Sequence, residues 1–296
     1  MFICGLPVIP AGVQRRAGIQ ALALACALFA AAPAQGQADP RLTLRNKAVQ
    51  GGLVFGRVRG APRVTLDGKP VQLGAGGYFV FGLAREAKPT AVLCLDWGEG
   101  QALTRSLAVR QRKYRIQRIN GLPEKYVREI DPTSPLYKRL EREYFLVKAA
   151  RERFSDLPHY RARFIWPARG RISGVYGSQR ILNGKPRRPH YGVDVAAPRG
   201  TRVVAAQAGV VALAHPGLYF AGKTIILDHG QGVTTTYIHL SRINVAAGQT
   251  VRRGQLIGRI GTTGRSTGPH LHWGLNWGEM YLDPGTLVGP MGRRNK

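Results

Sequence analysis

Short apolar runs separated by glycine-rich turns recur along most of the chain, and this pattern predicts strands rather than helices. Between about residues 51 and 109, apolar runs lie at 78–81, 91–95 and 107–109, and Asp67-Gly68 is a strong hairpin turn signal. The same pattern of short apolar runs and glycine-rich turns recurs from about residue 164 to 290. We therefore expect a mainly β protein, with a small N-terminal β-sandwich-like domain and a C-terminal antiparallel β-sheet domain.

The segment between the two β regions has a different period. Apolar residues recur there at helical spacing with charged residues between them, at Leu136, Leu140, Tyr144 and Val147, and Pro135 suits a first turn. This pattern predicts a helix over about 136–154 that packs on one or both domains. The chain then divides into an N-terminal β domain (45–112), a helical connector (113–160), a C-terminal domain (161–290) and a basic tail (291–296).

Two segments of the C-terminal region, 200–211 and 248–258, echo each other. Each has an apolar run, a glycine turn and a second apolar run, which predicts a pair of hairpins. Such hairpins also occur in biotinyl and lipoyl carrier domains, whose attachment lysine lies at the hairpin tip. Neither segment has a lysine at its turn, which argues against a carrier function.

The first 38 residues have the pattern of an export signal. Arg15 and Arg16 precede an almost uncharged stretch rich in Ala and Leu, 17–32, and Gly36-Gln37-Ala38 is the preferred cleavage site. The apolar stretch is shorter than the ~20 residues that span a bilayer, which favours cleavage over the alternative of a membrane anchor. We thus expect a periplasmic, cell-surface or secreted protein with no stable membrane span after cleavage.

The cysteine content and the net charge limit the disulfides that the chain can form and the partners that it can bind. Of the three cysteines only Cys94 lies beyond the signal, and one thiol forms no internal disulfide; its apolar run predicts a buried strand position. The net charge of +28 will attract polyanions. Basic residues are spread along the chain without a recognisable nucleic-acid-binding module. For an exported protein we therefore favour envelope polymers over nucleic acid as the polyanion.

Six of the seven histidines lie after residue 180, so some of them can converge on one site. His270 and His272 are two residues apart, and on a strand such residues share a face with their Cα atoms roughly 6–7 Å apart. Both imidazoles can therefore face one site, while Leu271, Trp273 and Leu275 pack on the opposite side. Neutral imidazole is the commonest zinc ligand, and a carboxylate is a good third partner.

His190 and Asp194 are the second candidate group. In a straight strand their Cα atoms would lie about 13 Å apart, too far for two ligands of one metal. Gly192 at the midpoint lets the backbone bend and brings both side chains to one point. A surface loop is the alternative interpretation of this motif.

His239 lies in an alternating, β-branched run at 234–240 that predicts a strand. Alternation places Tyr237 and His239 on one face and Ile238 and Leu240 on the other. We therefore expect His239 to be presented by the strand and not buried with the apolar residues.

Taken together and in this order, the segments resemble the LytM/lysostaphin-type zinc metallopeptidases, a family of peptidoglycan endopeptidases. The likeness covers about 164–290, and the upstream β domain with 114–122 is similar to the N-terminal part of some envelope members. The motifs that carry it are Trp166-Pro167, Ser173-Gly174-Val175-Tyr176-Gly177, His190-x-Gly-x-Asp194, Tyr237-x-His239-Leu240 and Gly268-Pro269-His270-Leu271-His272.

The resemblance implies one Zn²⁺ ion held by His190, Asp194 and His272, with His239 and His270 beside an open coordination position. Three protein ligands plus one water are the pattern of a catalytic site. Zinc-activated water, assisted by the two histidines as base and acid in either order, would hydrolyse peptide bonds of peptidoglycan. In a Gram-negative cell the family resemblance favours the D,D-bond between D-Ala and diaminopimelate over other stem-peptide or cross-link bonds.

Alternative functions remain open at this point. A non-catalytic peptidoglycan-binding activator of other cell-wall hydrolases would use the same groove, although all five site positions hold the expected residue types. Charge alone suggests nucleic-acid binding. The N-terminal domain carries no chemistry of its own, so we also expect intramolecular regulation of the active site by that domain. His159, His215 and His229 have no spacing partner and are expected to be structural or surface residues, and Glu279 receives no role.

Overall fold

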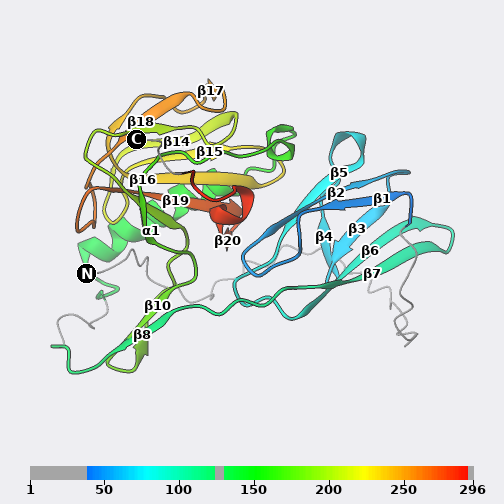
Figure 1. Ribbon diagram of the computed structural model, residues 1–296, viewed down its shortest axis with the longest axis horizontal. Helices are drawn as coiled ribbons and strands as arrows, with labels where there is room; N and C mark the ends of the chain where they lie inside the picture. Colours follow the sequence, from blue (N-terminus) through cyan, green and yellow to red (C-terminus); the bar gives the residue numbers. More distant parts are fainter. Residues whose placement is uncertain (1–38, 124–129, 293–296) are drawn as a thin grey trace.

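The computed structural model describes residues 39–123 and 130–292, so the proposed signal (1–38) and most of the basic tail lie outside the described residues. Figure 1 shows the small N-terminal sheets (blue to cyan) beside a large C-terminal sheet (green to red). Within the described residues, no helix is long and apolar enough to cross a membrane. The mainly β class predicted from the sequence is confirmed.

The N-terminal region consists of two antiparallel sheets that pack face to face. One has the order β1 (Leu42–Arg45), β2 (Leu53–Val58), β5 (Tyr78–Gly82), and the other β4 (Lys69–Val71), β3 (Arg63–Leu66), β6 (Thr90–Gly98), β7 (Gln101–Ala108). Their inner faces share a core that includes Phe79, Phe81, Leu93 and Leu95, as a sandwich requires. Asp67-Gly68, with φ of 48° and 75°, forms the predicted turn between β3 and β4.

Cys94 departs from its predicted environment. It lies in β6 as expected, but it shares a face with the exposed Val92 and is only half-buried. Its Sγ lies 3.6 Å from Thr104 Oγ1 of β7. The prediction of a buried position was wrong because an apolar run on a one-sided sheet places every second residue outside.

The C-terminal region is built on one ten-stranded sheet. Its main path runs β17 (Thr250–Val251), β14 (Gly209–Leu218), β15 (Gly222–Asp228), β16 (Val233–Ile243), β19 (His270–Trp277), β12 (Val193–Ala196), β9 (Arg171–Gly174). Off this path, β13 (Arg202–Val204) pairs with β18 (Leu256–Ile260), β18 with β16, and β20 (Met280–Leu282) with β19. One face is the main core, with Ile225, Tyr237, Leu271 and Trp273 fully buried. The opposite face carries the candidate site.

The two echoing segments pair with each other and not within themselves. β13 of the first segment pairs with β18 of the second, and β14 of the first pairs with β17 of the second. The prediction of two simple hairpins was therefore wrong. Apolar periodicity identifies the strands, but it does not identify their partners.

The connector is helical only in part. Its strand β8 (Ile116–Ile119) pairs in parallel with β10 (Gln179–Leu182), which also pairs with β11 (Lys185–Pro186). Helix α1 (Pro135–Arg151) begins after Ser134, whose Oγ accepts from the backbone N–H of Tyr137, and ends three residues before the predicted end. The described residues also form short 3-10 helices: η1 (Ala75–Gly77), η3 (His159–Arg161) and η4 (Pro284–Leu287).

Helix α1 packs on the site-bearing face of the large sheet. Its buried residues Leu140, Val147 and Ala150 recur at helical spacing, and the last two share a cluster with Leu218 and Ile226 of β14 and β15. Ile226 faces away from the main core, so α1 and that core lie on opposite sides of the sheet. The predicted apolar stripe is thus confirmed, and its partner is the C-terminal domain.

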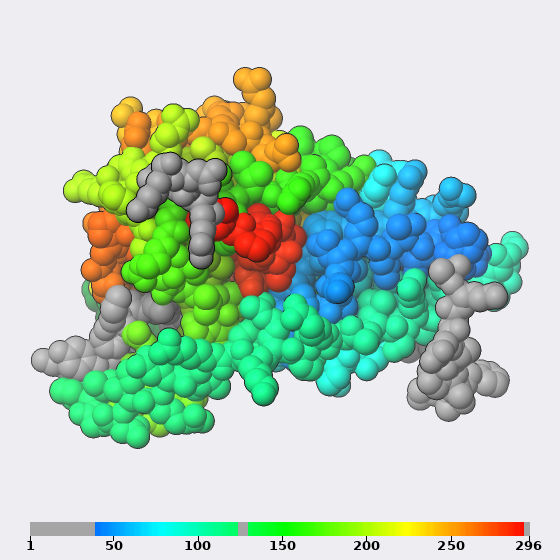
Figure 2. All heavy atoms as spheres, viewed as in Figure 1, coloured from blue at the N-terminus to red at the C-terminus, as the bar shows by residue number. Residues whose placement is uncertain are grey.

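The two β regions contact each other closely. Figure 2 shows C-terminal residues (red) lying directly against the N-terminal region (blue). Asp283 joins them twice: its backbone N–H donates to the carbonyl of Gly51 at 2.7 Å, and its carboxylate pairs with Arg112 at 2.7 Å. Leu53 and Phe55 also belong to the core of the large sheet. The boundaries drawn from the sequence stay a prediction, but the regions share part of one core.

His229 is a fully buried histidine, so of the two roles expected from the sequence, structural or surface, the surface position does not apply. Its Nδ1 donates to the carbonyl of Ala208 at 2.7 Å, its Nε2 lies 2.7 Å from Thr235 Oγ1, and the ring packs edge-on against Phe164. Burial lowers the pKa of His229 to about 4. Its buried contacts indicate a structural role, and its lowered pKa predicts that acid destabilises the fold.

Acid should destabilise the protein in a defined window because of His229. Between pH 6.5 and 4 the unfolded chain binds a proton on this ring and the folded chain does not, so stability is complete above this window and falls as pH falls. The unfolding free energy should drop by about 3 kcal/mol across the window from this group. Urea unfolding at pH 7 and pH 4.5 measures the drop, and His229→Gln should reduce it. Equal pH slopes in the two proteins would contradict the assignment.

Candidate metal centre

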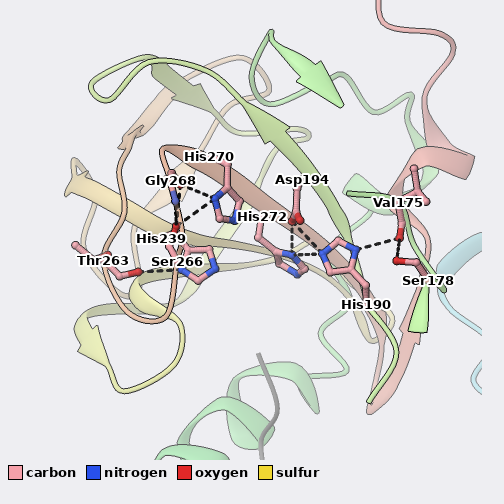
Figure 3. A network of polar contacts seen from close by, with 10 residues as sticks. All are labelled: Val175, Ser178, His190, Asp194, His239, Thr263, Ser266, Gly268, His270 and His272. Carbon is pink, nitrogen blue, oxygen red and sulfur yellow. Dashed lines mark hydrogen bonds and ion pairs between the residues drawn. The ribbon is translucent and has the colours of Figure 1, made fainter. Parts of the chain in front are cut away.

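Two neighbouring strands and one bend bring His190, Asp194 and His272 together (Figure 3). Asp194 of β12 is paired with His272 of β19, and His190 lies just before β12. The three candidate ligand atoms form a small triangle: His190 Nε2 to Asp194 Oδ1 is 3.0 Å, His190 Nε2 to His272 Nδ1 is 3.0 Å, and His272 Nδ1 to Asp194 Oδ1 is 2.8 Å. Atoms held about 2.0–2.1 Å from a tetrahedral zinc lie about 3.3 Å apart. The separations therefore fit one small metal ion.

The surroundings of the triangle fix the orientation of its members. His190 Nδ1 donates to the carbonyl of Val175 at 3.0 Å, which leaves Nε2 free of a proton and directed at the triangle. Two glycines allow the close approach. A Cβ at Gly174 would collide with the Asp194 carboxylate, and one at Gly192 would lie 2.6 Å from the His272 ring. Gly192 is a bend residue, as predicted, and it also makes room for a ligand of the neighbouring strand.

His270 and His239 lie beside the triangle, on the same side of the sheet. Strand β19 has the predicted alternation: His270 and His272 share the site face, while Leu271, Trp273 and Leu275 are fully buried behind it. The ring of His239 lies 4.8 Å from that of His270 and 6.4 Å from that of His272, between centroids. All five predicted site residues are therefore brought together.

His239 reaches the site by a different route from the one predicted. Tyr237 is in the main core, so regular alternation would carry His239 into the core with it. Instead His239 adopts a left-handed φ of 64°, and β16 has one extra residue relative to β15 between Tyr237 and Leu240. This bulge turns His239 to the face of Ile238. The expectation that Tyr237 and His239 share a face was wrong.

Backbone carbonyls hold both flanking histidines in one tautomer. His239 Nδ1 donates to the carbonyl of Thr263 at 2.9 Å, and His270 Nδ1 donates to that of Gly268 at 2.8 Å, with Ser266 Oγ 3.2 Å away. In each neutral ring Nε2 is then the unprotonated nitrogen. These carbonyls were not identified from the sequence, because a backbone acceptor leaves no residue-type signal.

Burial and mutual hydrogen bonds set the charge of the site. Burial alone would raise the pKa of Asp194, but its side-chain contacts with His190 and His272 outweigh it and hold that pKa well below its usual range. Burial lowers the pKa of His272, and it lowers that of His239 to about 4. Near neutral pH the site thus offers a carboxylate at Asp194 and neutral imidazoles at His239 and His272, and such groups are in the protonation states that bind zinc. Burial would lower the pKa of His190, but contact with the Asp194 carboxylate outweighs it and raises that pKa.

The remaining candidates lie elsewhere. His159 is in η3, His215 is in the second half of β14, where its Nδ1 accepts from Gly217 N–H, and His229 is fully buried. Glu279 pairs with Lys148 of α1 at 2.8 Å and so ties the helix to the sheet. None of these four belongs to the triangle of candidate ligands in the described chain.

Comparisons with known proteins point in one direction. Residues 188–284 match the model of Peptidase family M23. A crystal structure from Pseudomonas aeruginosa described as peptidase M23 superposes with a TM-score of 0.61 at 32% identity, covering 82% of this chain and 96% of that one. Peptidoglycan DD-endopeptidase ShyA of Vibrio cholerae is 43% identical over 116 residues, covering 38% of this chain and 26% of the relative.

A second curated relative is DD-carboxypeptidase/endopeptidase Mpg of Neisseria meningitidis. It is 48% identical over 121 residues, covering 40% of this chain and 27% of the relative. The matched part of this chain thus spans about a quarter of the length of these two curated relatives.

Proposed function

Because the chain belongs to peptidase family M23, we propose that it is an exported zinc metalloendopeptidase that hydrolyses peptide bonds of peptidoglycan. The observation that carries the proposal is the triangle of His190, Asp194 and His272 with two further histidines at its side. Two imidazole nitrogens and one carboxylate oxygen are a donor set that suits zinc and leaves a coordination position open. The residues present therefore fit the ion that the family implies.

The reaction divides between the ion and the two flanking histidines. Bound zinc supplies a Lewis acid that polarises the scissile carbonyl and lowers the pKa of a water molecule. Nε2 of neutral His239 or His270 can accept a proton from that water. A protonated imidazole can then stabilise the developing oxyanion or protonate the leaving amine. Two histidines with their Nδ1 protons fixed on carbonyls can carry out both steps, in either order.

For the substrate, we propose the cross-linked stem peptides of peptidoglycan. Two curated relatives are named as DD-endopeptidases, and one of them also as a DD-carboxypeptidase. In a Gram-negative cell the bond would be the D,D-bond between D-Ala and diaminopimelate. The net charge of +28 and the proposed signal support an envelope location.

Muropeptide analysis tests this proposal. The mature chain, loaded with one equivalent of zinc, should convert cross-linked dimers of purified sacculi into monomers and release new amino groups. A chelator should stop the reaction and added zinc should restore it. Intact dimers with the zinc-loaded chain alone, but faster cleavage when a second wall hydrolase is present, would contradict the proposal and support the activator alternative.

Regulation by the N-terminal region stays a prediction. None of the described residues of 39–123 lines the cavity beside the metal centre, whereas Asp283, close behind β20, is held by Gly51 and Arg112. Arg112→Ala breaks the ion pair with Asp283 and should raise the rate of wall hydrolysis by loosening this contact. An unchanged rate in a variant with native melting temperature would reject the hypothesis.

A further inference from the structure

A cavity of about 90 Å³ lies between helix α1 and the face of the sheet that carries the metal centre. His190 and His272 are among the residues that line it. Its floor comes from strands β15, β16 and β19, and its roof includes Glu143, Val147 and Arg151 of α1. A group the size of a side chain could therefore occupy this cavity next to two of the candidate metal ligands.

Helix α1 is held over this cavity from both sides. Toward the end of β14, Arg139 donates to the carbonyl of Gly217 at 3.2 Å, and Glu143 accepts from the backbone N–H of Tyr219 at 2.8 Å. Toward β20, Lys148 pairs with Glu279 and Arg151 Nη1 donates to Tyr281 OH at 2.8 Å. The roof is thus built into the fold, and it places Arg151 at a defined position.

The cavity has hydrogen-bond donors that lack a partner among the described residues. Asn276 Nδ2, Thr236 Oγ1 and Arg151 Nε are such atoms, and each belongs to a residue of the lining. Asn276 is 1% exposed and Thr236 is 5% exposed. A buried polar group without a partner costs about 1–3 kcal/mol. A bound group that accepts hydrogen bonds could satisfy such donors.

The charge around the cavity favours an anion. The guanidinium groups of Arg188 and Arg151 lie 4.4 Å and 4.9 Å from the centroid of the Tyr281 ring. Neither forms an ion pair with a carboxylate in the described part of the chain. The one acidic residue of the lining, Glu143, already accepts from Arg139 and from Tyr219 N–H. The lining thus contains two arginines that no carboxylate of the described residues pairs with.

We propose that this cavity binds a carboxylate of the substrate residue whose amine is released, through Arg151, Arg188 and Asn276. The proposal rests on the proposed function and adds the feature by which the site selects its substrate. The carboxyl carbon of the other residue at the scissile bond is the reacting carbonyl itself, so a free carboxylate beside the bond belongs to the amine side. A terminal D-Ala and a diaminopimelate linked through its side-chain amine both carry one there. One site could then cleave both kinds of D,D-bond.

Matched peptides test this assignment. A peptide that ends in D-Ala-D-Ala as the free acid should have a KM about 10–100-fold lower than its carboxamide, because charge-assisted hydrogen bonds contribute about 1.5–3 kcal/mol. Arg151→Gln should raise KM for the acid and reduce the preference to about threefold or less, while zinc content stays the same. Arg142→Gln, on the exposed side of α1, is the control. Arg188→Gln provides a second variant, because replacing Arg151 also removes a hydrogen bond that holds α1 on the sheet.

Binding separates this inference from the proposed function. The zinc-loaded full chain carrying His239→Ala should bind the acid more tightly than the carboxamide in calorimetry, and Arg151→Gln should remove the difference. Selective binding without any hydrolysis by the wild-type chain would overturn the proposed function and leave the carboxylate site standing. Hydrolysis with equal KM for acid and carboxamide, or a preference that survives both arginine variants, would overturn the carboxylate site alone.

Discussion

His272→Ala should lower kcat/KM for peptidoglycan fragments by about 10⁴-fold or more and remove stoichiometric zinc from the purified chain. His272 supplies one of only three candidate ligands, and its Nδ1 lies 3.0 Å or less from each of the other two ligand atoms. Binding of structural zinc by four ligands is worth about 10–16 kcal/mol, so loss of one ligand in three removes several kcal/mol. Without the ion no group lowers the pKa of the attacking water.

Metal analysis and muropeptide hydrolysis on the same sample measure both effects. His159→Ala, in η3 outside the site, is the matched control and should retain zinc and turnover. The melting temperature must be followed, because removal of His272 also removes a hydrogen-bond partner of Asp194. A variant that keeps one zinc per chain and its native rate would refute the ligand assignment.

His239→Ala and His270→Ala should each lower kcat by about 10²–10⁴-fold while zinc stays bound at one equivalent. Neither ring belongs to the ligand triangle, and each has its Nδ1 proton on a backbone carbonyl, so each can contribute only its Nε2 to proton transfer. Loss of the base should remove the acid limb of the pH–rate profile, and loss of the acid should remove the alkaline limb. The two variants therefore assign the two roles.

The measurement is kcat of each variant across pH 5–9, together with the zinc content of the same sample. His215→Ala, in the second half of β14, serves as the control because its Nδ1 accepts from the nearby Gly217 N–H and the residue lies outside the candidate site. Loss of zinc in either variant would show that the replaced histidine binds the ion or positions one of its ligands. A kcat within twofold of the wild type would exclude it from the chemistry.

Much of the site could be predicted because its residues obey local rules. The i,i+2 spacing of His270 and His272 fixes a common face on any strand, and the buried Leu271 and Trp273 confirm it. The spacing of His190 and Asp194 with a glycine between them indicated a bend, and the structure has one at Gly192. The family resemblance then predicted which residues are ligands and which are flanking histidines, a distinction that spacing alone left open.

Other features depend on partners that lie far away in the sequence. The bulge at His239 arises where β16 adjusts its register to β15, and periodicity in one strand contains no information on register. The crosswise pairing of β13 with β18 and of β14 with β17 has the same origin. The apolar stripe of α1 was visible, but the face of the sheet that it covers was not.

The left-handed backbone of His239 has a consequence for the evolution and engineering of this chain. A non-glycine residue in that conformation costs about 1–3 kcal/mol, a penalty that glycine would relieve. Selection for thermal stability alone would therefore replace this histidine, and a stabilised but inactive scaffold for crystallising substrate complexes would begin with His239→Gly. At this residue, which performs proton transfer in our proposal, a gain in stability would therefore be accompanied by a loss of catalytic activity.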